Sequence, residues 1–560
     1  MPKQRRIAGI VFFLLCSVLA HGAELRLPAV EARAASGVPA SNIPAATAPV
    51  EDNTSGGLHF RIVRYRISGN TLIDGATLQT IVQPYTGEDR DFDTIQSAVD
   101  TIYAAYNNAG YQTVRVIIPE QALEDGIVKL RVIESKLRNI GVQGNRYHGN
   151  DNVLNTLSNI KLGQIPNSKD VEENLRLANE NYSKQTQVTF RATDKEGEAE
   201  GIARVMDKEP GRAAMLLDNT GTKPTGQYRL GLLYQNANVL NRDHQFSLMY
   251  QTSPNHLSKV RIASSQYRIP LYDWGAIMEL GAGYSNVNSG LIATAAGNYT
   301  VAGSGRSYSG RFIKLLPRIG KFDQRANLGM EERVFNNNVN FAGTTTSLVP
   351  NIVLHPWSLG YDGTVRDTGT EWSLGFSREM NRPSGKDSDA AAFALPGQRF
   401  GANPKYILWR YNLAYSTAFS DNWLMRFQFN GQQTRDALVS GAQFGVGGME
   451  SVRGFNEREL ADDQGKRATL EIQTPNLSLL DGSIWSGTKA LWFYDAANLK
   501  HNKALLGEAL SHNIASTGLG LRTALGKQGM ARLDFADVLR GDGVRKKGSK
   551  MIHAGMSYLF

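Results

Sequence analysis

Cysteine is almost absent from this sequence of 560 residues, since Cys16 is the only one. It lies within residues 1–23, which have the layout of a cleaved export signal, so the mature chain is predicted to contain no thiol. Disulfide bonds and thiolate metal sites are thereby excluded from the mature protein, whichever redox compartment it occupies.

Long apolar segments are also missing. After residue 20, no apolar run approaches the roughly 20 residues that a membrane-spanning helix needs, which excludes a helical membrane transporter. Proline is scarce at 19 residues, whereas glycine is abundant at 56, a share above the average of about 7%. Because neither collagen-like repeats nor proline-rich disorder fits this composition, the glycine belongs to ordered structure.

The export signal has three parts. Lys3, Arg5 and Arg6 form a basic start, residues 7–20 carry no charge, and residues 20–23 are mostly small. An uncharged stretch of this length is too short to cross a bilayer core of about 30 Å, which argues against a membrane anchor. We therefore predict that residues 1–23 are a signal peptide and that the rest of the chain is exported.

Charge and motifs exclude several classes of function. Without the signal peptide, 58 basic residues face 52 acidic ones, and this net charge of +6 is too dispersed to predict nucleic-acid binding. No Gly-x-x-x-x-Gly-Lys-Ser/Thr phosphate loop occurs, so nucleotide hydrolysis is not indicated. No Gly-x-Ser-x-Gly motif stands out and the nine histidines lack ligand spacing, so we predict no enzyme, no metal site and no cofactor.

Residues 24–58 are predicted to be a flexible segment. They are rich in Ala, Pro, Ser, Thr and Gly, a composition that cannot bury a core. A short helix within residues 24–36 is conceivable from composition, but Pro28 interrupts it.

Residues 59–135 and 136–211 are predicted to be two copies of one small α+β unit. Ile67-Ser68-Gly69-Asn70 recurs as Val142-Gln143-Gly144-Asn145, 75 residues later. In the first copy, alternating apolar residues predict a strand before this motif, and apolar residues at helical spacing follow it: Ile95, Val99, Ile102 and Tyr106. The expected order in each copy is strand, helix, helix, strand, strand, in tandem.

Two finer features of the repeat can be predicted. Asp93 and Gln96 resemble a capping box, which would place the start of the long helix there. Tyr106 is matched to Tyr182, 76 residues further on.

Residues 212–560 are predicted to form a β-barrel. Beyond Gly211 helical periodicity disappears, and segments of about ten residues alternate between apolar and polar side chains. Within residues 423–430, one face carries Trp423, Met425, Phe427 and Phe429, and the other carries Arg426, Gln428 and Asn430. Strands of 9–11 residues with this alternation are typical of an outer-membrane barrel, which pairs its backbone groups by closing on itself.

The barrel is predicted to have sixteen strands. Candidate strands begin near residues 212, 227, 243, 257, 273, 307, 323, 346, 370, 405, 421, 466, 486, 514, 529 and 549. Glycine- and asparagine-rich stretches obscure the strand limits within residues 286–345. A soluble sandwich or jelly roll is the alternative, but 349 residues are too many for one. The predicted fold class is therefore two tandem α+β units followed by a 16-stranded antiparallel transmembrane barrel.

A long loop interrupts the barrel at residues 435–465. It contains several glycines and then Val452-Arg453-Gly454-Phe455. Loops of this length inside a compact architecture are usually functional, and a barrel of sixteen strands is wide enough to hold an aqueous channel.

Arg453 would need a carboxylate partner if this loop lies in the lumen. Asp495 is the first candidate, because alternation places it with Phe493 on the lumen face of its strand, and Glu471 is the second. Spacing alone leaves open the other interpretation, in which Arg453 is a solvated loop residue paired with Glu450 or Glu457.

Two repeats before a barrel, with Val452-Arg453-Gly454-Phe455 in the loop before the twelfth strand, resemble the TpsB transporters of two-partner secretion, the haemolysin secretion/activation proteins of the BamA-like superfamily. The resemblance covers essentially the whole mature chain. Further matching segments are Gly110-Tyr111, Pro119-Glu120-Gln121, Asp125-Gly126 and Leu217-Asp218-Asn219.

The resemblance implies that the repeats are periplasmic POTRA domains. They would capture a large unfolded exoprotein of the TpsA type, and the barrel would conduct it through the outer-membrane lipid to the cell surface. It also implies that Arg453 pairs with Asp495 to hold the loop inside the barrel. Family members often carry a pore-plugging N-terminal helix, and residues 24–36 offer only a short stretch for it. The alternatives are a general barrel-assembly factor, a passive porin and a membrane-embedded hydrolase.

Overall fold

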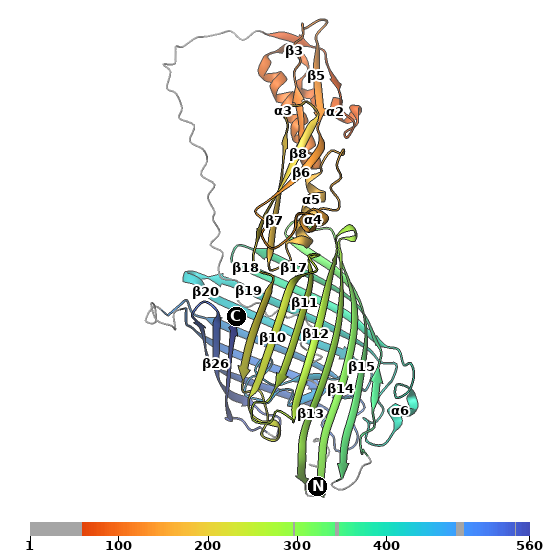
Figure 1. The fold of residues 1–560 in the computed structure, drawn as a ribbon, viewed down its shortest axis with the longest axis vertical. Helices are drawn as coiled ribbons and strands as arrows, with labels where there is room; N and C mark the ends of the chain where they lie inside the picture. Colours follow the sequence, from red (N-terminus) through yellow and green to blue (C-terminus); the bar gives the residue numbers. More distant parts are fainter. Residues whose placement is uncertain (1–58, 295–296, 342–346, 478–486, 544) are drawn as a thin grey trace. The chain divides into compact units, whose positions relative to one another are not determined.

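The computed structural model describes residues 59–294, 297–341, 347–477, 487–543 and 545–560. The predicted signal peptide, the segment 24–58 and the question of a plug helix lie outside these residues. Two compact units divide the described chain, one ending at Lys208 and one beginning at Glu209 (Figure 1). No helix in the described residues is long and apolar enough to cross a membrane.

The first α+β unit contains the predicted order of elements, with two short strands, β1 and β3, that were not predicted. Its elements are β1 (Phe60–Ile62), β2 (Arg64–Ser68), α2 (Gly75–Val82), β3 (Gly87–Arg90), α3 (Phe92–Ala109), β4 (Val114–Ile117) and β5 (Ile127–Glu134). The main sheet has the order β2-β5-β4, with β2 parallel and β4 antiparallel to β5, and β1 pairs with β3. The helices pack on this sheet through a buried core that includes Leu78, Ile102 and Tyr106.

The second unit repeats this topology. Its elements are β6 (Lys136–Gln143), α4 (Asn150–Asn155), α5 (Ser168–Ala178), β7 (Lys184–Ala192) and β8 (Glu198–Asp207). The sheet order is β6-β8-β7, with β6 parallel and β7 antiparallel to β8. The strand order therefore matches that of the first unit, as the repeat predicted.

The Gly-Asn pair found in the sequence forms the same turn in both units. Gly69 and Gly144 have φ of 82° and 85°, and a Cβ on either would overlap a carbonyl oxygen of the neighbouring strand. The following Asn70 and Asn145 donate from Nδ2 to a backbone carbonyl three residues ahead, at 2.9 and 2.7 Å. The repeat thus reflects a backbone requirement.

A carboxylate at the end of the last strand holds each turn. Glu134 accepts hydrogen bonds from the backbone N–H groups of residues 71 and 72, at 2.8 and 3.0 Å. Asp207 accepts from the backbone N–H groups of residues 146–148. Burial raises the pKa of each carboxyl, but hydrogen bonds from the side chains of Thr71 and His148, together with these backbone bonds, outweigh burial and hold the pKa of Glu134 and of Asp207 below the ordinary value.

We expect Glu134→Gln to lower the free energy of unfolding of the first unit by about 1–2 kcal/mol at neutral pH, because an amide nitrogen cannot accept the hydrogen bond that Thr71 Oγ1 donates to the second carboxylate oxygen. A folded-state pKa below the unfolded value means that this stabilisation is complete above the unfolded pKa and is lost as pH falls through the folded one. In the unaltered protein, local unfolding should therefore become easier below about pH 4.5. Hydrogen-exchange mass spectrometry of peptides from residues 60–135 in the full-length protein measures this.

The matched control for this prediction is Glu120→Gln, on an exposed residue of the same unit. The hydrogen exchange of this variant should equal that of the unaltered protein both at neutral pH and below about pH 4.5. Equal destabilisation by the two substitutions, or an unchanged response to acid in Glu134→Gln, would show that the carboxylate does not hold the turn.

Two finer predictions on the repeats were wrong. The long helix α3 begins after Asp91, whose carboxylate accepts from the N–H of Thr94 at 2.8 Å, so Asp93 and Gln96 do not cap it. Tyr182 follows the end of α5, whereas Tyr106 lies inside α3, so the two tyrosines are not equivalent. The second helix is shorter, and a fixed spacing therefore overshoots it.

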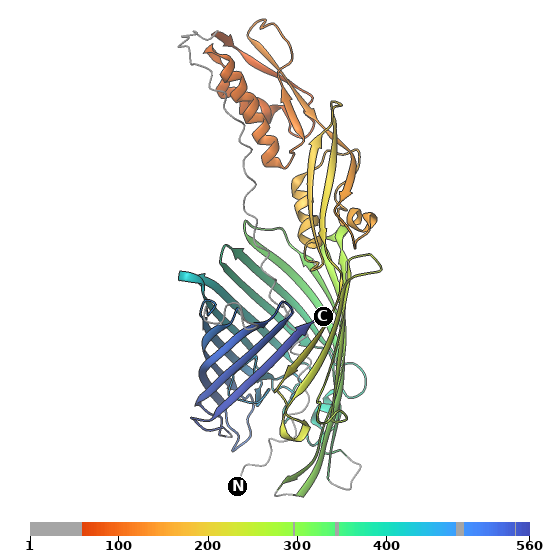
Figure 2. The same cartoon turned by 60° about the vertical axis from the view of Figure 1, so that its left-hand side comes forward.

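The barrel closes with sixteen strands, as predicted, because β16 and β17 both pair with β15 and form one interrupted strand. They are β9 (Gly211–Asp218), β10 (Arg229–Val239), β11 (His244–Thr252), β12 (Val260–Leu271), β13 (Ala276–Thr294), β14 (Gly297–Leu315), β15 (Phe322–Phe341), β16 (Ile352–Leu354) with β17 (Pro356–Asp367), β18 (Thr370–Asn381), β19 (Ile407–Phe419), β20 (Trp423–Thr434), β23 (Gln464–Gln473), β24 (Lys489–Lys500), β25 (Ser511–Leu525), β26 (Gly529–Arg540) and β27 (Lys550–Leu559). The last strand pairs with the first, which removes the sheet edge (Figure 2).

Strand lengths differ from the prediction in one region. The strands β13, β14 and β15 span 19, 19 and 20 residues, against the expected 9–11, and they extend beyond the rest of the wall (Figure 1). The strand expected near 307 begins at Gly297. The prediction missed this start because the first half of the strand is rich in glycine and serine and lacks apolar alternation. Elsewhere β9 begins at Gly211 and β23 at Gln464, so the inserted loop spans 435–463.

Candidate functional site

The loop between β20 and β23 folds back on itself as a hairpin. Its strands β21 (Phe444–Val446) and β22 (Leu460–Asp462) pair antiparallel, and residues 447–459 form the tip. Gly447 and Gly448 both have φ of 109°, which favours glycine, and a Cβ on Gly448 would overlap the Glu457 carboxyl. The glycines therefore allow the tip to turn tightly.

Apolar side chains of the tip pack against the barrel wall. Val452 and Phe455 are fully buried. Their cluster combines residues of the hairpin with residues of three wall strands: Val446, Leu460, Ala497, Leu499, Ile514 and Val538. Burial of each of the two side chains stabilises the docked loop by about 1.5–3 kcal/mol.

Arg453 binds the wall strand β24 through a bidentate ion pair. Its Nε lies 2.8 Å from Asp495 Oδ2 and its Nη2 lies 2.9 Å from Asp495 Oδ1. The backbone N–H of Arg453 donates to the same carboxylate at 3.1 Å. Both side chains are almost completely buried, at 3% and 0% exposure, so the pair is shielded from solvent screening.

Two further wall strands contribute carboxylates to Arg453. Glu471 on β23 accepts from Nη1 at 2.7 Å, and Asp534 on β26 lies 3.7 Å from the same nitrogen. Asp534 is also held by Arg522 and Arg532, at 2.8 and 2.9 Å. Three guanidinium groups thus face three carboxylates across β23 to β26. We call Arg453, Glu471, Asp495 and Asp534 the arginine clamp.

The ring of Phe493 packs against the guanidinium group of Arg453. The guanidinium carbon of Arg453 lies 3.5 Å from the ring centroid, a cation–π contact in a desolvated site. Gly518 on the next strand leaves room for this ring, because a Cβ there would lie 2.6 Å from its Cζ. A side chain at Gly520 would likewise overlap Asp534. The glycines of β25 are therefore part of the site.

Gly454 attaches the tip to the last strand. Its backbone N–H donates to Nε2 of His553 on β27 at 2.9 Å, so this nitrogen must carry no proton. Gly454 has φ of 91°, a conformation that disfavours other residues. The motif 452–455 thus contacts the wall through two apolar side chains, the ion pairs of Arg453 with Asp495 and Glu471, and two backbone N–H bonds.

The structure brings together every residue that the sequence singled out for this site. Val452, Arg453, Gly454 and Phe455 lie at the tip, and Phe493, Asp495 and Glu471 lie on the facing wall. Glu450 and Glu457 are bound elsewhere, Glu450 to Arg532 and Glu457 to the N–H of Met449. Sequence reasoning missed Asp534, Arg522, Arg532 and His553.

The site contains groups that hold a loop in place. Each carboxylate of the clamp is bound to a guanidinium group, which leaves no free base at the centre. Within the described residues, no group of three or more His, Asp or Glu side chains could hold a metal ion. The arrangement can fix the loop tip against the lumen face of β23 to β27. Release of the loop tip from this wall would change the space available in the lumen.

A closed sixteen-stranded barrel preceded by two α+β units, with an arginine-anchored loop inside, defines a class of outer-membrane transport proteins. A family profile described as "Haemolysin secretion/activation protein ShlB/FhaC/HecB" matches residues 202–523, and one described as "POTRA domain, ShlB-type" matches residues 60–135. The chain belongs to the haemolysin secretion/activation family of ShlB, FhaC and HecB. The resemblance to TpsB transporters is thereby confirmed.

Characterised relatives are similar over most of their length. The outer membrane transporter CdiB of Escherichia coli O6:K15:H31 (strain 536 / UPEC) is 23% identical over 75% of this chain and 70% of its own. The heme/hemopexin transporter protein HuxB of Haemophilus influenzae is 22% identical over 86% of this chain and 84% of its own. The solved structure of CdiB from Escherichia coli shares the fold, with a TM-score of 0.75 and 18% identity over 92% of this chain and 93% of that one.

These findings fix the location of the protein. The barrel spans the outer membrane and the POTRA domains lie in the periplasm. The chain is an outer-membrane transporter of a family that secretes exoproteins. Since β9 starts at the periplasmic end of the barrel, the loops after β9 and after every second strand from it, including 435–463, lie at the outer rim.

Proposed function

We propose that the protein captures one large unfolded exoprotein of the TpsA type with its POTRA domains and conducts it through the barrel without nucleotide hydrolysis. The observation that carries the capture step is a free sheet edge in the second POTRA domain. The clamp carries the conduction step, because it positions the loop in the lumen.

The free edge belongs to β7. Ser183 O accepts from Lys208 N on the side of β8, whereas both the N–H and the C=O of Thr186 are bound to the Asn179 side chain on the opposite side. Backbone groups alternate along a strand, so those of Val188 and Phe190 also point away from β8. No strand among the described residues pairs with this edge.

The other sheet edges are less suitable. The opposite edge of the same sheet, β6, is partly covered, because Leu137 exchanges hydrogen bonds with residues 163 and 164. In the first POTRA domain, the edge strands β2 and β4 have five and four residues, against nine for β7. An extended substrate therefore gains most main-chain hydrogen bonds on β7.

Strand addition suits a substrate that has not folded. Main-chain hydrogen bonds depend little on sequence, so one edge can hold successive segments of a long chain. The side chains that flank the edge are exposed and polar, namely Gln187, Thr189 and Arg191. Because these side chains are polar, they would disfavour permanent pairing of the substrate with β7. Folding of the exoprotein outside the cell would then bias its movement outward.

Cysteine cross-linking tests the capture step, because the mature chain lacks cysteine. We expect Thr189→Cys on β7 to cross-link to cysteines introduced along a stalled exoprotein. Glu173→Cys, exposed on α5 of the same domain, is the control and should give at most a tenth of that yield. Equal yields would contradict capture on β7, and cross-links to many barrel precursors would favour a general assembly factor.

A further inference from the structure

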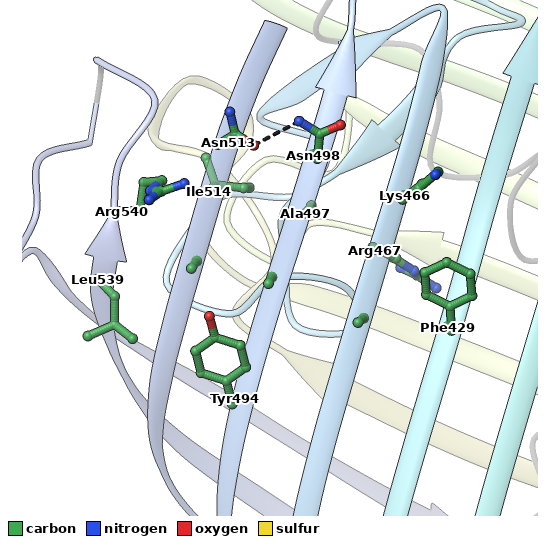
Figure 3. Close-up of a pocket in the computed structure, with 13 residues that line it drawn as sticks. Phe429, Lys466, Arg467, Tyr494, Ala497, Asn498, Asn513, Ile514, Leu539 and Arg540 are labelled. Carbon is green, nitrogen blue, oxygen red and sulfur yellow. Dashed lines mark hydrogen bonds between the residues drawn. The ribbon is translucent and has the colours of Figure 1, made fainter.

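The outer wall of the barrel carries a hollow of about 450 Å³ across β20 and β23 to β26 (Figure 3). Its lining residues are Phe429, Lys466, Arg467, Ala468, Tyr494, Ala496, Ala497, Asn498, Asn513, Ile514, Ala515, Leu539 and Arg540. Most of its lining side chains, such as Tyr494, Ala496 and Asn498, lie on the face of these strands opposite the clamp, whereas Arg467, Ala497 and Ile514 alternate with them and belong to the lumen face.

Three alanines in register form the floor. Ala468 lies opposite Ala496, and Ala496 lies opposite Ala515, on three neighbouring strands. Ala496 shares its face with Tyr494, which is 40% exposed, whereas Asp495 between them faces the lumen and is fully buried. The floor therefore faces the lipid, and small side chains in one row make it concave.

Polar groups form the next row on the same face. Lys466 lies opposite Asn498, and Asn498 lies opposite Asn513, to which its Nδ2 donates at 2.7 Å. Arg540 lies at the end of the alanine row, because it is opposite Ala515 on the fourth strand. Figure 3 shows the two amides together, with Lys466 and Arg540 on either side of them.

The electrostatics of the hollow favour an anion. None of its lining residues is acidic. Lys466 and Arg540 are both exposed, and no carboxylate of the described residues forms an ion pair with either. Apolar side chains border the other end, where Figure 3 shows Phe429, Tyr494 and Leu539. The site is therefore amphipathic, with a cation on each side of the amide pair and an apolar floor.

The charged end lies near the outer rim. Because β23 is the twelfth strand from the periplasmic start, it begins at the outer rim, and Lys466 is its third residue. Arg540 is the last residue of β26, which ends at the same rim. The outer leaflet of this membrane is built from lipopolysaccharide, whose lipid A carries phosphates above its acyl chains.

We propose that this hollow binds lipid A, a phosphorylated glycolipid of the outer leaflet. One acyl chain lies on the alanine floor, and a phosphate lies between Lys466, the two amides and Arg540. Basic pockets on membrane proteins recognise lipid headgroups by the same combination of charge and adjoining apolar surface. The bound lipid would sit against the strands that carry the clamp on their inner face.

Native mass spectrometry of the full-length protein in detergent, titrated with bisphosphorylated lipid A, tests this assignment. We expect the double variant Lys466→Gln/Arg540→Gln to bind about thirtyfold more weakly, from about one kcal/mol for each cation. The control Lys386→Gln/Lys405→Gln removes two exposed cations from another outer loop and should bind like the unaltered protein. Heat-modifiable migration in gels confirms that each barrel is folded.

Two further measurements distinguish binding in the hollow from general attraction of lipid A to positive charge. Ala496→Trp fills the floor and keeps both cations, and it should also weaken lipid A binding at least tenfold. Dephosphorylated lipid A should bind poorly to every form, and millimolar inorganic phosphate should not displace lipid A. Equal loss in both double variants, or unchanged binding in Ala496→Trp, would overturn the assignment.

Discussion

Replacing Arg453 by alanine is expected to reduce export of the exoprotein at least tenfold while the amount of folded barrel stays the same. The substitution leaves Asp495 and Glu471 facing each other without their shared cation, and Asp495 is fully buried. Breaking a buried ion pair from one side costs about 3–5 kcal/mol, which is enough to release the loop tip. The strand ladder of the barrel does not use this side chain, so closure should be unaffected.

Export is measured as exoprotein at the cell surface, divided by folded barrel in the outer membrane. Arg435→Ala is the matched control, since Arg435 is an exposed arginine of the same loop and outside the clamp. It should export normally. Normal export by Arg453→Ala would show that the clamp is dispensable for transport, and loss of the barrel itself would show that Arg453 serves assembly.

Replacing Asp495 by alanine should give the second-largest loss, smaller than that of Arg453→Ala. Arg453 would keep Glu471 at 2.7 Å and Asp534 nearby, so the cation retains partners. In Arg453→Ala, by contrast, two carboxylates lose their common partner. The order of the two effects follows from this asymmetry.

The double variant Arg453→Ala/Asp495→Ala should lose less than the sum of the two single losses, because each single change already breaks the same pair. Export is expressed as the logarithm of the normalised yield for the four proteins of the cycle. Strict additivity would mean that Arg453 and Asp495 act separately, and the clamp would then be wrong as an account of their role.

Alternation along single strands predicted much of the site. Trp492 and Tyr494 point to lipid and Phe493 and Asp495 to the lumen, because a strand in a barrel wall has one wet and one apolar side. A lone arginine in a long loop then needs a carboxylate, and the strand offers one. Local chemistry thus made Asp495 the first candidate, although spacing alone left Glu450 and Glu457 open as partners.

The rest of the site depends on closure of the barrel, which no local pattern encodes. Asp534 and His553 reach the loop, and Arg522 reaches Asp534, only because β25, β26 and β27 curve around the loop. Alternation along their strands could have placed these residues on the lumen face. It could not have shown which residue each of them binds. The early start of β14 was missed for a related reason, because its glycine- and serine-rich half pairs along the backbone with little side-chain alternation.

The most direct test of the central claim is cross-linking of a stalled exoprotein inside the barrel. Gln428 lies in register with Thr469 and Asp495, so it faces the lumen, whereas its neighbour Phe427 lies in register with Tyr494 and faces lipid. We predict that Gln428→Cys cross-links to cysteines along the exoprotein and that Phe427→Cys does not. Cross-linking of neither position, or of both equally, would contradict transport through the lumen.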